Sequence, residues 1–418
     1  MTTLLAVGDM HLGRPPTALP EDLHQRQAQL GPEAAWQRVV SEAIERRVDG
    51  VLLAGDVVER SRDFFVAYGQ LKSGIEQLAD AGIPVLAVAG NHDTHVLPRL
   101  ADEIDQLHLL GRDGEWEEAR LDDLTVLGWS FPQPQVRRSP LDTLDDARRD
   151  RTVIGLLHCD RDQADSAHAP VSSEALERAP VDAWLLGHIH KPDPLDEDRP
   201  IGYLGSVTAL RASETGARGP WLVQVSPGAV VTDQVPLAPL RYERLEIDCS
   251  ELEQAEGLGE RILAECRSAV GRLNELDYQP EALGLRLVLT GSTALGSALQ
   301  EVANELADDG RSWDEDGIAC FIQKVELATS PAVDLRRLAR QSDPCGLLAR
   351  RLIALQDPGS DEYRRLVETG HRQLDPVVRS REFRDLGRAL DDRAVAEWLH
   401  RAGLTALNRM LDQRGATK

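Results

Sequence analysis

Ile83-Pro-Val-Leu-Ala-Val-Ala-Gly-Asn-His-Asp93 is the stretch of sequence that indicates the fold of this chain. Its apolar, β-branched run Val85–Ala89 predicts a buried strand, which ends at Gly90. In an open α/β sheet, ligands bind beyond the carboxyl ends of the strands. The three polar residues that follow are therefore site candidates by position as well as by type: Asn91, His92 and Asp93.

The same kind of ending recurs on four other predicted strands. Short apolar runs at Leu4–Val7, Gly50–Ala54, Thr152–Leu157 and Ala183–Leu186 are each followed closely by an acid or a histidine. Helical spacing from Pro32 to Arg47 and from about Arg62 to Ala81 alternates with the strands, which predicts a layered α/β domain. The polar residues at the five strand ends are Asp9, His11, Asp56, Asn91, His92, His158, His188 and His190.

These residue types suit a pair of divalent metal ions. Two ions about 3.5–4 Å apart need one bridging carboxylate and several nitrogen or oxygen ligands on each side. Asp56 is the natural bridge, and ligands without thiolate favour Mn²⁺, Fe²⁺ or Zn²⁺. A single histidine of this kind is more often a solvated polar residue, but five such endings on successive strands favour a binuclear centre.

The rest of the chain divides into two further parts. After Pro192 the pattern turns to strands, and Pro236–Leu240 reads as a linker. A second α/β unit follows, and from Pro331 the chain is helical with proline interruptions. We therefore expect domains at residues 1–240, 241–330 and 331–418. One apolar stripe near the end either packs on its own domain or docks a partner: Val395, Trp398, Leu399, Ala402, Leu407, Met410 and Leu411.

Composition restricts the partners. With 47 Lys and Arg against 70 Asp and Glu, the formal charge is −23, so nucleic acid is repelled at long range. Binding to DNA would have to depend on a local basic patch, on metals or on another protein; Arg14, Arg60 and Arg211 are candidates, and Arg137-Arg138 lies in a proline-flanked loop. The apolar runs are too short to span a bilayer, and five widely spaced cysteines suit a reducing cytoplasm.

The strand-end motifs carry a family resemblance. Asp9-Met-His11, Gly55-Asp56, Gly90-Asn-His-Asp93, His158 and Gly187-His-Ile-His190 resemble the five signatures of the calcineurin-like metallophosphoesterases. The finer similarity is to their DNA-repair exonuclease branch, the SbcD/Mre-type subunits, and above all to the YhaO-like group. Further motifs of that branch are Leu127-Gly-Trp-Ser-Phe131, His168-Ala-Pro170, and Gly205-Ser206 with Arg211, Glu214 and Gly219.

The resemblance implies a fold and a division of roles. The fold would be a sandwich of two sheets flanked by helices, with a smaller α/β capping domain and a helical tail. One metal would be held by Asp9, His11, Asp56 and His190, and the other by Asp56, Asn91, His158 and His188. His92 would face the scissile phosphate. Beyond the resemblance, we expect Asp93 to orient His92 as an outer partner, and the charge argument makes Arg14 and Arg211 the candidate substrate-binding residues.

The implied function is Mn²⁺-dependent exonuclease or endonuclease cleavage of DNA in repair. Such subunits work with an SMC-like ATPase of the SbcC or YhaN type, and a homodimer is also implied. No Gly-x-x-x-x-Gly-Lys-Ser/Thr segment occurs, so ATP would be hydrolysed by the partner. The alternatives are a small-substrate phosphoesterase, such as a cyclic-nucleotide phosphodiesterase or a phosphoprotein phosphatase, and a non-catalytic scaffold for the ATPase. Val57-Val58-Glu59 departs from the branch, which usually has Asp or His at the third position, so the cleavage polarity stays open.

Overall fold

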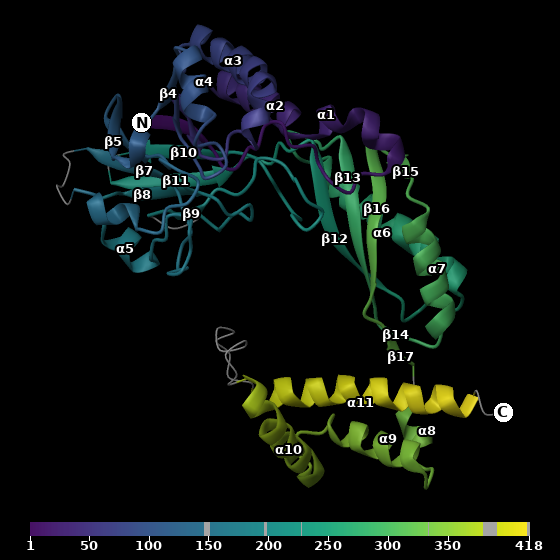
Figure 1. Ribbon diagram of the computed structural model, residues 1–418. Helices are drawn as coiled ribbons and strands as arrows, with labels where there is room; N and C mark the ends of the chain where they lie inside the picture. Colours follow the sequence, from purple (N-terminus) through teal and green to yellow (C-terminus); the bar gives the residue numbers. More distant parts are fainter. Residues whose placement is uncertain (146–150, 196–198, 227, 333, 379–390, 416–418) are drawn as a thin grey trace. The chain divides into compact units, whose positions relative to one another are not determined.

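The structure is a computed structural model, and it describes residues 1–145, 151–195, 199–226, 228–332, 334–378 and 391–415 (Figure 1). Contacts between residues divide the chain into two compact units, each of which is described by itself. The first unit comprises 1–245, 264–286 and 307–324, and the second comprises 246–263, 287–306 and 325–418.

A six-stranded sheet forms half of the sandwich in the first unit. Its strand order is β11-β10-β1-β2-β3-β4, in which β1 to β4 run parallel and β10 and β11 pair antiparallel beside β1. The strands are β1 (Thr2–Val7), β2 (Gly50–Ala54), β3 (Val85–Val88), β4 (Leu107–Leu109), β10 (Trp221–Ser226) and β11 (Ala229–Gln234).

A five-stranded sheet forms the other half. Its order is β5-β6-β7-β8-β9, parallel from β6 onward, with β5 antiparallel at the edge. The strands are β5 (Glu117–Leu121), β6 (Leu124–Trp129), β7 (Thr152–His158), β8 (Ala183–Gly187) and β9 (Ile201–Tyr203). The sequence did not predict β5, because Glu-Glu-Ala-Arg-Leu has little β-propensity and becomes a strand only by pairing with β6.

Each central strand is apolar throughout because both of its faces are covered. In β1, Leu4 and Ala6 pack in the layer between the two sheets, whereas Leu5 and Val7 pack under helices. Those helices are α2 (Pro32–Arg46), α3 (Phe64–Asp80) and α4 (Leu97–Glu103), which lie together in Figure 1. The short helix α5 (Ser173–Arg178) places Leu176 against Trp184 on the outer face of the other sheet. The expected sandwich of two sheets flanked by helices is confirmed.

The connection before α2 contains ordered turns. It forms a 3₁₀ turn, η1 (Glu21–Arg26), and a single α-turn, α1 (Gln27–Leu30). Leu23 and Leu30 are buried in a small core with Tyr242 and Phe321, which are also in the first unit. The remaining 3₁₀ turns are η2 (Ser61–Asp63), η3 (Arg112–Gly114), η4 (Pro140–Thr143) and η5 (Ala255–Gly257).

A four-stranded sheet in the order β12-β13-β16-β15 contributes residues to both units. Its strands are β12 (Leu240–Asp248), β13 (Ala282–Thr290), β15 (Ser312–Glu315) and β16 (Ile318–Leu327), and its helices are α6 (Leu258–Leu273) and α7 (Gly296–Asp308). The short strands β14 (Ser292–Thr293) and β17 (Ser330–Pro331) pair with each other in the second unit.

The helical end of the chain is part of the second unit. Its helices are α8 (Leu335–Leu338), α9 (Pro344–Ala354), α10 (Asp361–Val378) and α11 (Asp392–Gly415). In α11, Leu407 is fully buried against α9 and Val395 against α10, and Leu399, Met410 and Leu411 join the same cores. Most of the apolar stripe therefore packs on its own unit, while Ala402 and Trp398 are exposed, Trp398 to 48%.

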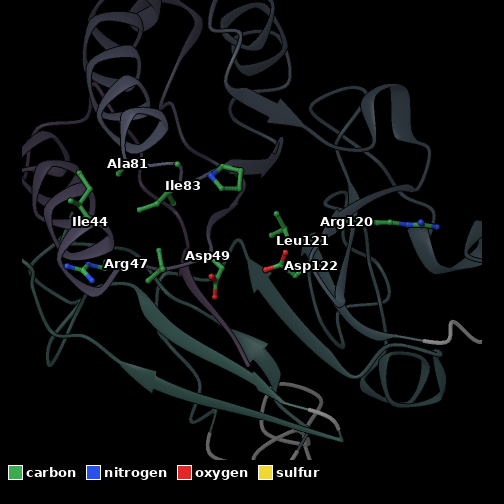
Figure 2. Close-up of a pocket in the computed structure, with 11 residues that line it drawn as sticks. Ile44, Arg47, Asp49, Ala81, Ile83, Arg120, Leu121 and Asp122 are labelled. Atoms are coloured by element: carbon green, nitrogen blue, oxygen red, sulfur yellow. The ribbon is translucent and has the colours of Figure 1, made fainter.

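The two edges of the sandwich differ. At the amino-terminal ends of β2 and β3 lies a pocket of about 690 Å³, whose lining includes Arg47, Asp49, Arg120 and Asp122 (Figure 2). The opposite edge holds the polar strand ends expected from the sequence. Among the described residues, the helices are too short or too polar to cross a membrane.

Candidate metal centre

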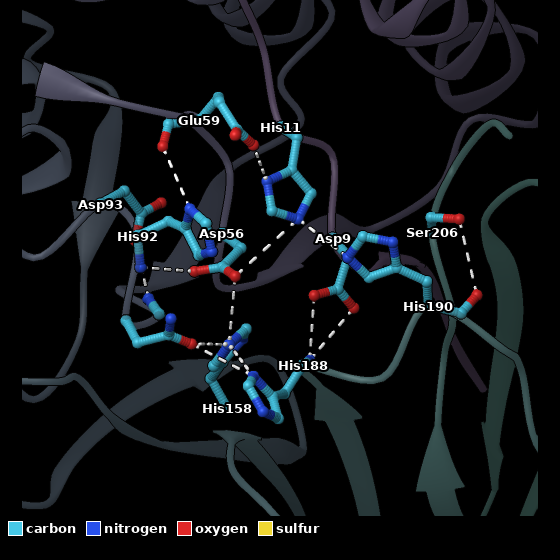
Figure 3. A network of polar contacts seen from close by, with 12 residues as sticks. Asp9, His11, Asp56, Glu59, His92, Asp93, His158, His188, His190 and Ser206 are labelled. Atoms are coloured by element: carbon cyan, nitrogen blue, oxygen red, sulfur yellow. Dashed lines mark hydrogen bonds and ion pairs between the residues drawn. The ribbon is translucent and has the colours of Figure 1, made fainter. Parts of the chain in front are cut away.

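Six of the seven predicted metal ligands meet at one edge of the sandwich (Figure 3), and the seventh, Asn91, contacts His158 and His188 there. Asp9, Asp56 and Asn91 follow β1, β2 and β3 of the six-stranded sheet. His158 ends β7, and His188 follows β8 of the five-stranded sheet. Because the carboxyl ends of these parallel strands point the same way, residues far apart in sequence become neighbours.

One group of ligand atoms gathers around His11. Asp9, His11 and His190 each present an atom within 4.8 Å of the others. The Nε2 atoms of His11 and His190 are 3.1 Å apart. These residues are three of the four expected to hold the first metal.

A second group gathers around Asn91. Its Oδ1 lies 3.1 Å from Nε2 of His158 and 3.1 Å from Nδ1 of His188. Asp56 Oδ2 is 3.4 Å from the same His158 nitrogen and 3.8 Å from Nε2 of His11. One Asp56 oxygen therefore lies between the two groups, where a bridging carboxylate would have to be.

Every histidine in these groups has an acceptor behind it. The ring nitrogen that faces away from the centre is 2.8 Å from Glu59 Oε2 in His11 and 3.0 Å from the Ala54 carbonyl oxygen in His158. In His188 it is 3.2 Å from Asp160 Oδ1, and in His190 it is 2.8 Å from Glu214 Oε1. A carbonyl or carboxylate only accepts, so each of these partners favours the tautomer with its proton on the outer nitrogen, which would leave the lone pair of the inner nitrogen for a metal ion.

This donor set fits cations. The Nε2 atoms of His11 and His190 face each other at 3.1 Å, where they either share a proton or both offer lone pairs to a cation. At His158, Asp56 also favours positive charge: burial opposes the charged form of this ring, but Asp56 outweighs burial and raises the pKa of His158 to about 9. Burial opposes ionisation of Asp56 too, yet His158 and its neighbours hold the pKa of that carboxyl well below its usual range. The centre therefore favours divalent ions bound by oxygen and imidazole.

The backbone at the strand ends is strained in a consistent way. Asp9, His11, Asp56 and His188 have φ angles of 31°, 51°, 48° and 107°, although none is glycine. Left-handed conformations cost non-glycine residues of order 1–3 kcal/mol and cluster at functional sites. Here they turn each side chain back over the end of its strand, into the centre.

His92 and Asp93 differ from each other in role. The His92 ring is exposed, and its Nδ1 donates to the Glu59 carbonyl oxygen at 3.2 Å, while its backbone N–H donates to Asp56. The Asp93 carboxylate instead accepts from the backbone N–H groups of Gly90 and Val57, each at 2.7 Å. The expectation that Asp93 orients the His92 ring is therefore wrong. Asp93 fixes the two strand-end loops, and burial raises its pKa to about 7.

The predicted substrate-binding arginines lie in different environments. Arg14 is largely buried and is 3.4 Å from Glu59, so its charge is already paired. Arg211 is exposed, and its carbonyl oxygen accepts from the N–H of Glu214. Glu59 also contacts His11, and that hydrogen bond contributes most to holding the pKa of Glu59 down, at about 2.

The sequence did not predict which residues contact the predicted ligands from behind. Asp160 lies two residues after His158 and contacts the outer nitrogen of His188. The His168 ring packs against the His188 ring with 5.0 Å between centroids. The buried Arg218 guanidinium donates to the carbonyl oxygen of His190. Only the spatial approach of distant segments reveals these contacts, although His168 and Glu214 belong to motifs that the sequence contained.

Comparison with known proteins agrees with this geometry. Residues 2–192 match the calcineurin-like phosphoesterase family, and residues 242–330 match the middle domain of metallophosphoesterase YhaO. The chain is 30% identical over 335 residues to the DNA double-strand break repair protein Mre11 of Haloferax volcanii. The aligned region covers 76% of this chain and 69% of that protein. It is 25% identical to the uncharacterized metallophosphoesterase YhaO of Bacillus subtilis, over 69% of this chain and 72% of that protein. It is 29% identical to Mre11 of Aeropyrum pernix, over 64% and 70% respectively.

Proposed function

Because this chain belongs to the calcineurin-like phosphoesterase family, we propose that it is a nuclease that hydrolyses phosphodiester bonds of DNA during repair. The single observation that carries the proposal is the convergence of two ligand groups on Asp56. The relatives named for DNA double-strand break repair support DNA as the substrate. Exonuclease action, with endonuclease action beside it, is the form of activity that we expect.

We propose two divalent ions, with Mn²⁺ preferred over Fe²⁺ and Zn²⁺. Asp9, His11, Asp56 and His190 would hold one ion, and Asp56, Asn91, His158 and His188 the other. When bound, such a pair neutralises the charge of a phosphodiester and supplies a nucleophile from water near neutral pH. The ligands are oriented in advance by Glu59, Asp160 and Glu214, which contact the outer ring nitrogens.

His92 is the residue that we assign to proton transfer. Its ring is exposed beside the centre, with 5.1 Å between its centroid and that of His11. The Glu59 carbonyl holds Nδ1–H and leaves Nε2 free to face a substrate. A proton delivered from Nε2 to the leaving oxygen would complete the cleavage.

We further propose a partner and a domain division. The partner is an SMC-like ATPase, which would supply the energy for moving DNA, and the helical region 331–418 would dock it. The exposed face of α11 that contains Trp398 supports this assignment. The division into 1–240, 241–330 and 331–418 is supported by the YhaO middle-domain match at 242–330.

The test is a nuclease assay of the full chain on end-labelled linear and hairpin DNA with Mn²⁺ or Mg²⁺. Bis-p-nitrophenyl phosphate and cyclic AMP are run in parallel, and Asp56→Asn is the matched inactive variant. We expect metal-dependent shortening of the linear DNA that Asp56→Asn lacks. Hydrolysis of the small diesters without any cleavage of DNA would overturn the nuclease proposal and favour a small-substrate phosphoesterase.

A further inference from the structure

The loop after β6 begins at the metal edge. Phe131 donates its backbone N–H to the Ala89 carbonyl oxygen at 3.0 Å, directly beyond β3. Its ring meets the ring of His158 edge-on, with 5.7 Å between centroids. The chain therefore enters residues 132–138 next to a predicted ligand of the second metal.

The far end of the same loop returns to the metal edge. The N–H of Val136 donates to the Ala167 carbonyl oxygen, and the N–H of Ala169 donates to the Val136 carbonyl oxygen, both at 2.7 Å. His168, between those two partners, packs its ring on His188. Both ends of the loop are thus fixed against ligands of the second metal. Pro132 and Pro134 further restrict its backbone.

The loop is positively charged in a chain of net charge −23. Arg137 and Arg138 are exposed, and neither forms an ion pair with any residue in the part of the chain that the structure describes. They line a hollow of about 870 Å³ with Gln133, Pro134, Gln135 and Val136, and none of the described residues in its wall is a carboxylate. Arginine binds phosphate through a planar, two-pronged donor set.

We propose that Arg137 and Arg138 bind the phosphate backbone of the DNA strand beyond the scissile bond, on the side of the second metal. This inference rests on the proposed nuclease function and adds to it the surface along which the substrate lies. The two arginines follow Val136 directly, and the loop that carries them is fixed at both ends beside residues that contact His158 and His188. They supply the local positive charge that so acidic a protein needs to hold DNA.

A second pair of arginines provides a matched comparison. Arg47 and Arg120 are also exposed and also line a hollow, but at the opposite edge of the sandwich (Figure 2). Asp49 and Asp122 line that hollow with them, which reduces its attraction for phosphate. Two positive charges can therefore be removed either at the metal edge or at the opposite edge of the same unit, and the effects on DNA binding can be compared.

The experiment compares three full-length proteins: the wild type, R137Q/R138Q and the control R47Q/R120Q. Binding of a labelled duplex is measured from 50 to 200 mM salt, together with manganese content and hydrolysis of bis-p-nitrophenyl phosphate. The salt slope is the change in the logarithm of the binding constant with the logarithm of the salt concentration. Each lost phosphate contact reduces its magnitude by about 0.9, so the slope of R137Q/R138Q should be smaller than that of the wild type by about 1.8. Over this fourfold salt range the wild type should therefore lose roughly 12-fold more affinity than R137Q/R138Q.

The outcomes separate the inference from the function on which it rests. A salt slope of R137Q/R138Q equal to that of the wild type, with DNA still cleaved, would overturn the role of the loop alone. An equal fall in the control would also overturn it, because charge would then act without regard to position. A wild type that binds and cleaves no DNA would overturn the nuclease function itself. Support requires a loss on DNA at least tenfold larger than any loss on the small diester.

Discussion

The Nδ1 atom of His11 lies 2.8 Å from a carboxylate oxygen of Glu59. Glu59 stands where the nuclease branch usually has Asp or His, yet it fixes the orientation of a predicted metal ligand. The same carboxylate pairs with Arg14. The departure from the family pattern would therefore affect how the proposed first metal is held as well as how DNA would reach the centre.

Replacing Glu59 should lower the affinity for the first metal ion and leave the protein folded. In Glu59→Gln the amide can still reach His11 but lacks the negative charge that favours the Nδ1–H tautomer. Loss of such an outer partner typically costs 10–100-fold in metal affinity. Calorimetric titration with Mn²⁺ measures this, with Glu174→Gln on the exposed surface of α5 as the control. A titration identical to the wild type would show that Glu59 is dispensable for the ligand.

Replacing Asp56 should affect both ions. Asp56→Asn keeps the shape of the side chain, whose Oδ2 lies between His11 and His158, but removes its charge. We expect elemental analysis after Mn²⁺ loading to find close to two ions in the wild type and close to none in this variant. His190→Ala should retain one ion. A variant Asp56→Asn that still holds one ion would mean that Asp56 serves a single metal.

Substitutions of His92 and Asp93 should affect different properties, catalysis for His92 and stability for Asp93. His92→Ala should keep its metal and lower the chemical step by roughly 10²–10⁴-fold, the scale of a lost general acid. Single-turnover cleavage and metal content together measure this. Loss of metal in His92→Ala would instead make His92 a ligand.

Asp93→Asn should act on stability. Its carboxylate accepts two 2.7 Å bonds from backbone amides in a fully buried place, and the amide group of Asn would oppose one of them. The free energy of unfolding should fall by about 1–3 kcal/mol, the cost of leaving a buried donor unpaired. Denaturant unfolding followed by circular dichroism measures it, and Asp80→Asn on the surface of α3 is the control. Equal stability of the two variants would leave Asp93 without this structural role.

The two faces of α11 should separate stability from partner binding. Leu407→Ala opens a cavity in the core beside α9 and should destabilise the second unit by about 2–5 kcal/mol. Trp398→Ala, on the exposed face, should leave the thermal transition near that of the wild type but reduce co-purification with the ATPase. Unchanged co-purification would remove Trp398 from the docking surface.

The sequence predicted the parts of this protein that depend on local pattern. Strands such as Val85–Val88 are short apolar runs followed closely by glycine, and the polar residues after them are recognisable as candidate ligands from their positions in the chain. Contacts between distant segments were not predictable in this way. Asp160 reaches His188 only because two neighbouring parallel strands end side by side, and nothing in the spacing of Glu59 assigns it to His11.

For Asp93, the sequence suggested a contact with the His92 ring that the structure does not contain among the described residues. Its place next to His92 suggested a partner for that ring, but neighbours in an extended or turning chain point in different directions. The strand-end loop instead turns the carboxylate back onto Gly90. The apolar stripe of α11 left self-packing and docking as alternatives, and only the positions of α9 and α10 divide its residues between an inner and an outer face.

The predicted metal ligands come from both sheets, and this would affect how the domain resists unfolding. The layer between the sheets is apolar, and hydrophobic burial by itself is non-directional. Ions held jointly by Asp56 from one sheet and His158 from the other would act as a cross-link at one edge of that layer. Removing the ions with a chelator should then lower the melting temperature. Backbone amides at the carboxyl ends of β2 and β7 should also begin hydrogen exchange before the other amides of the two sheets, because the strand ends would separate first.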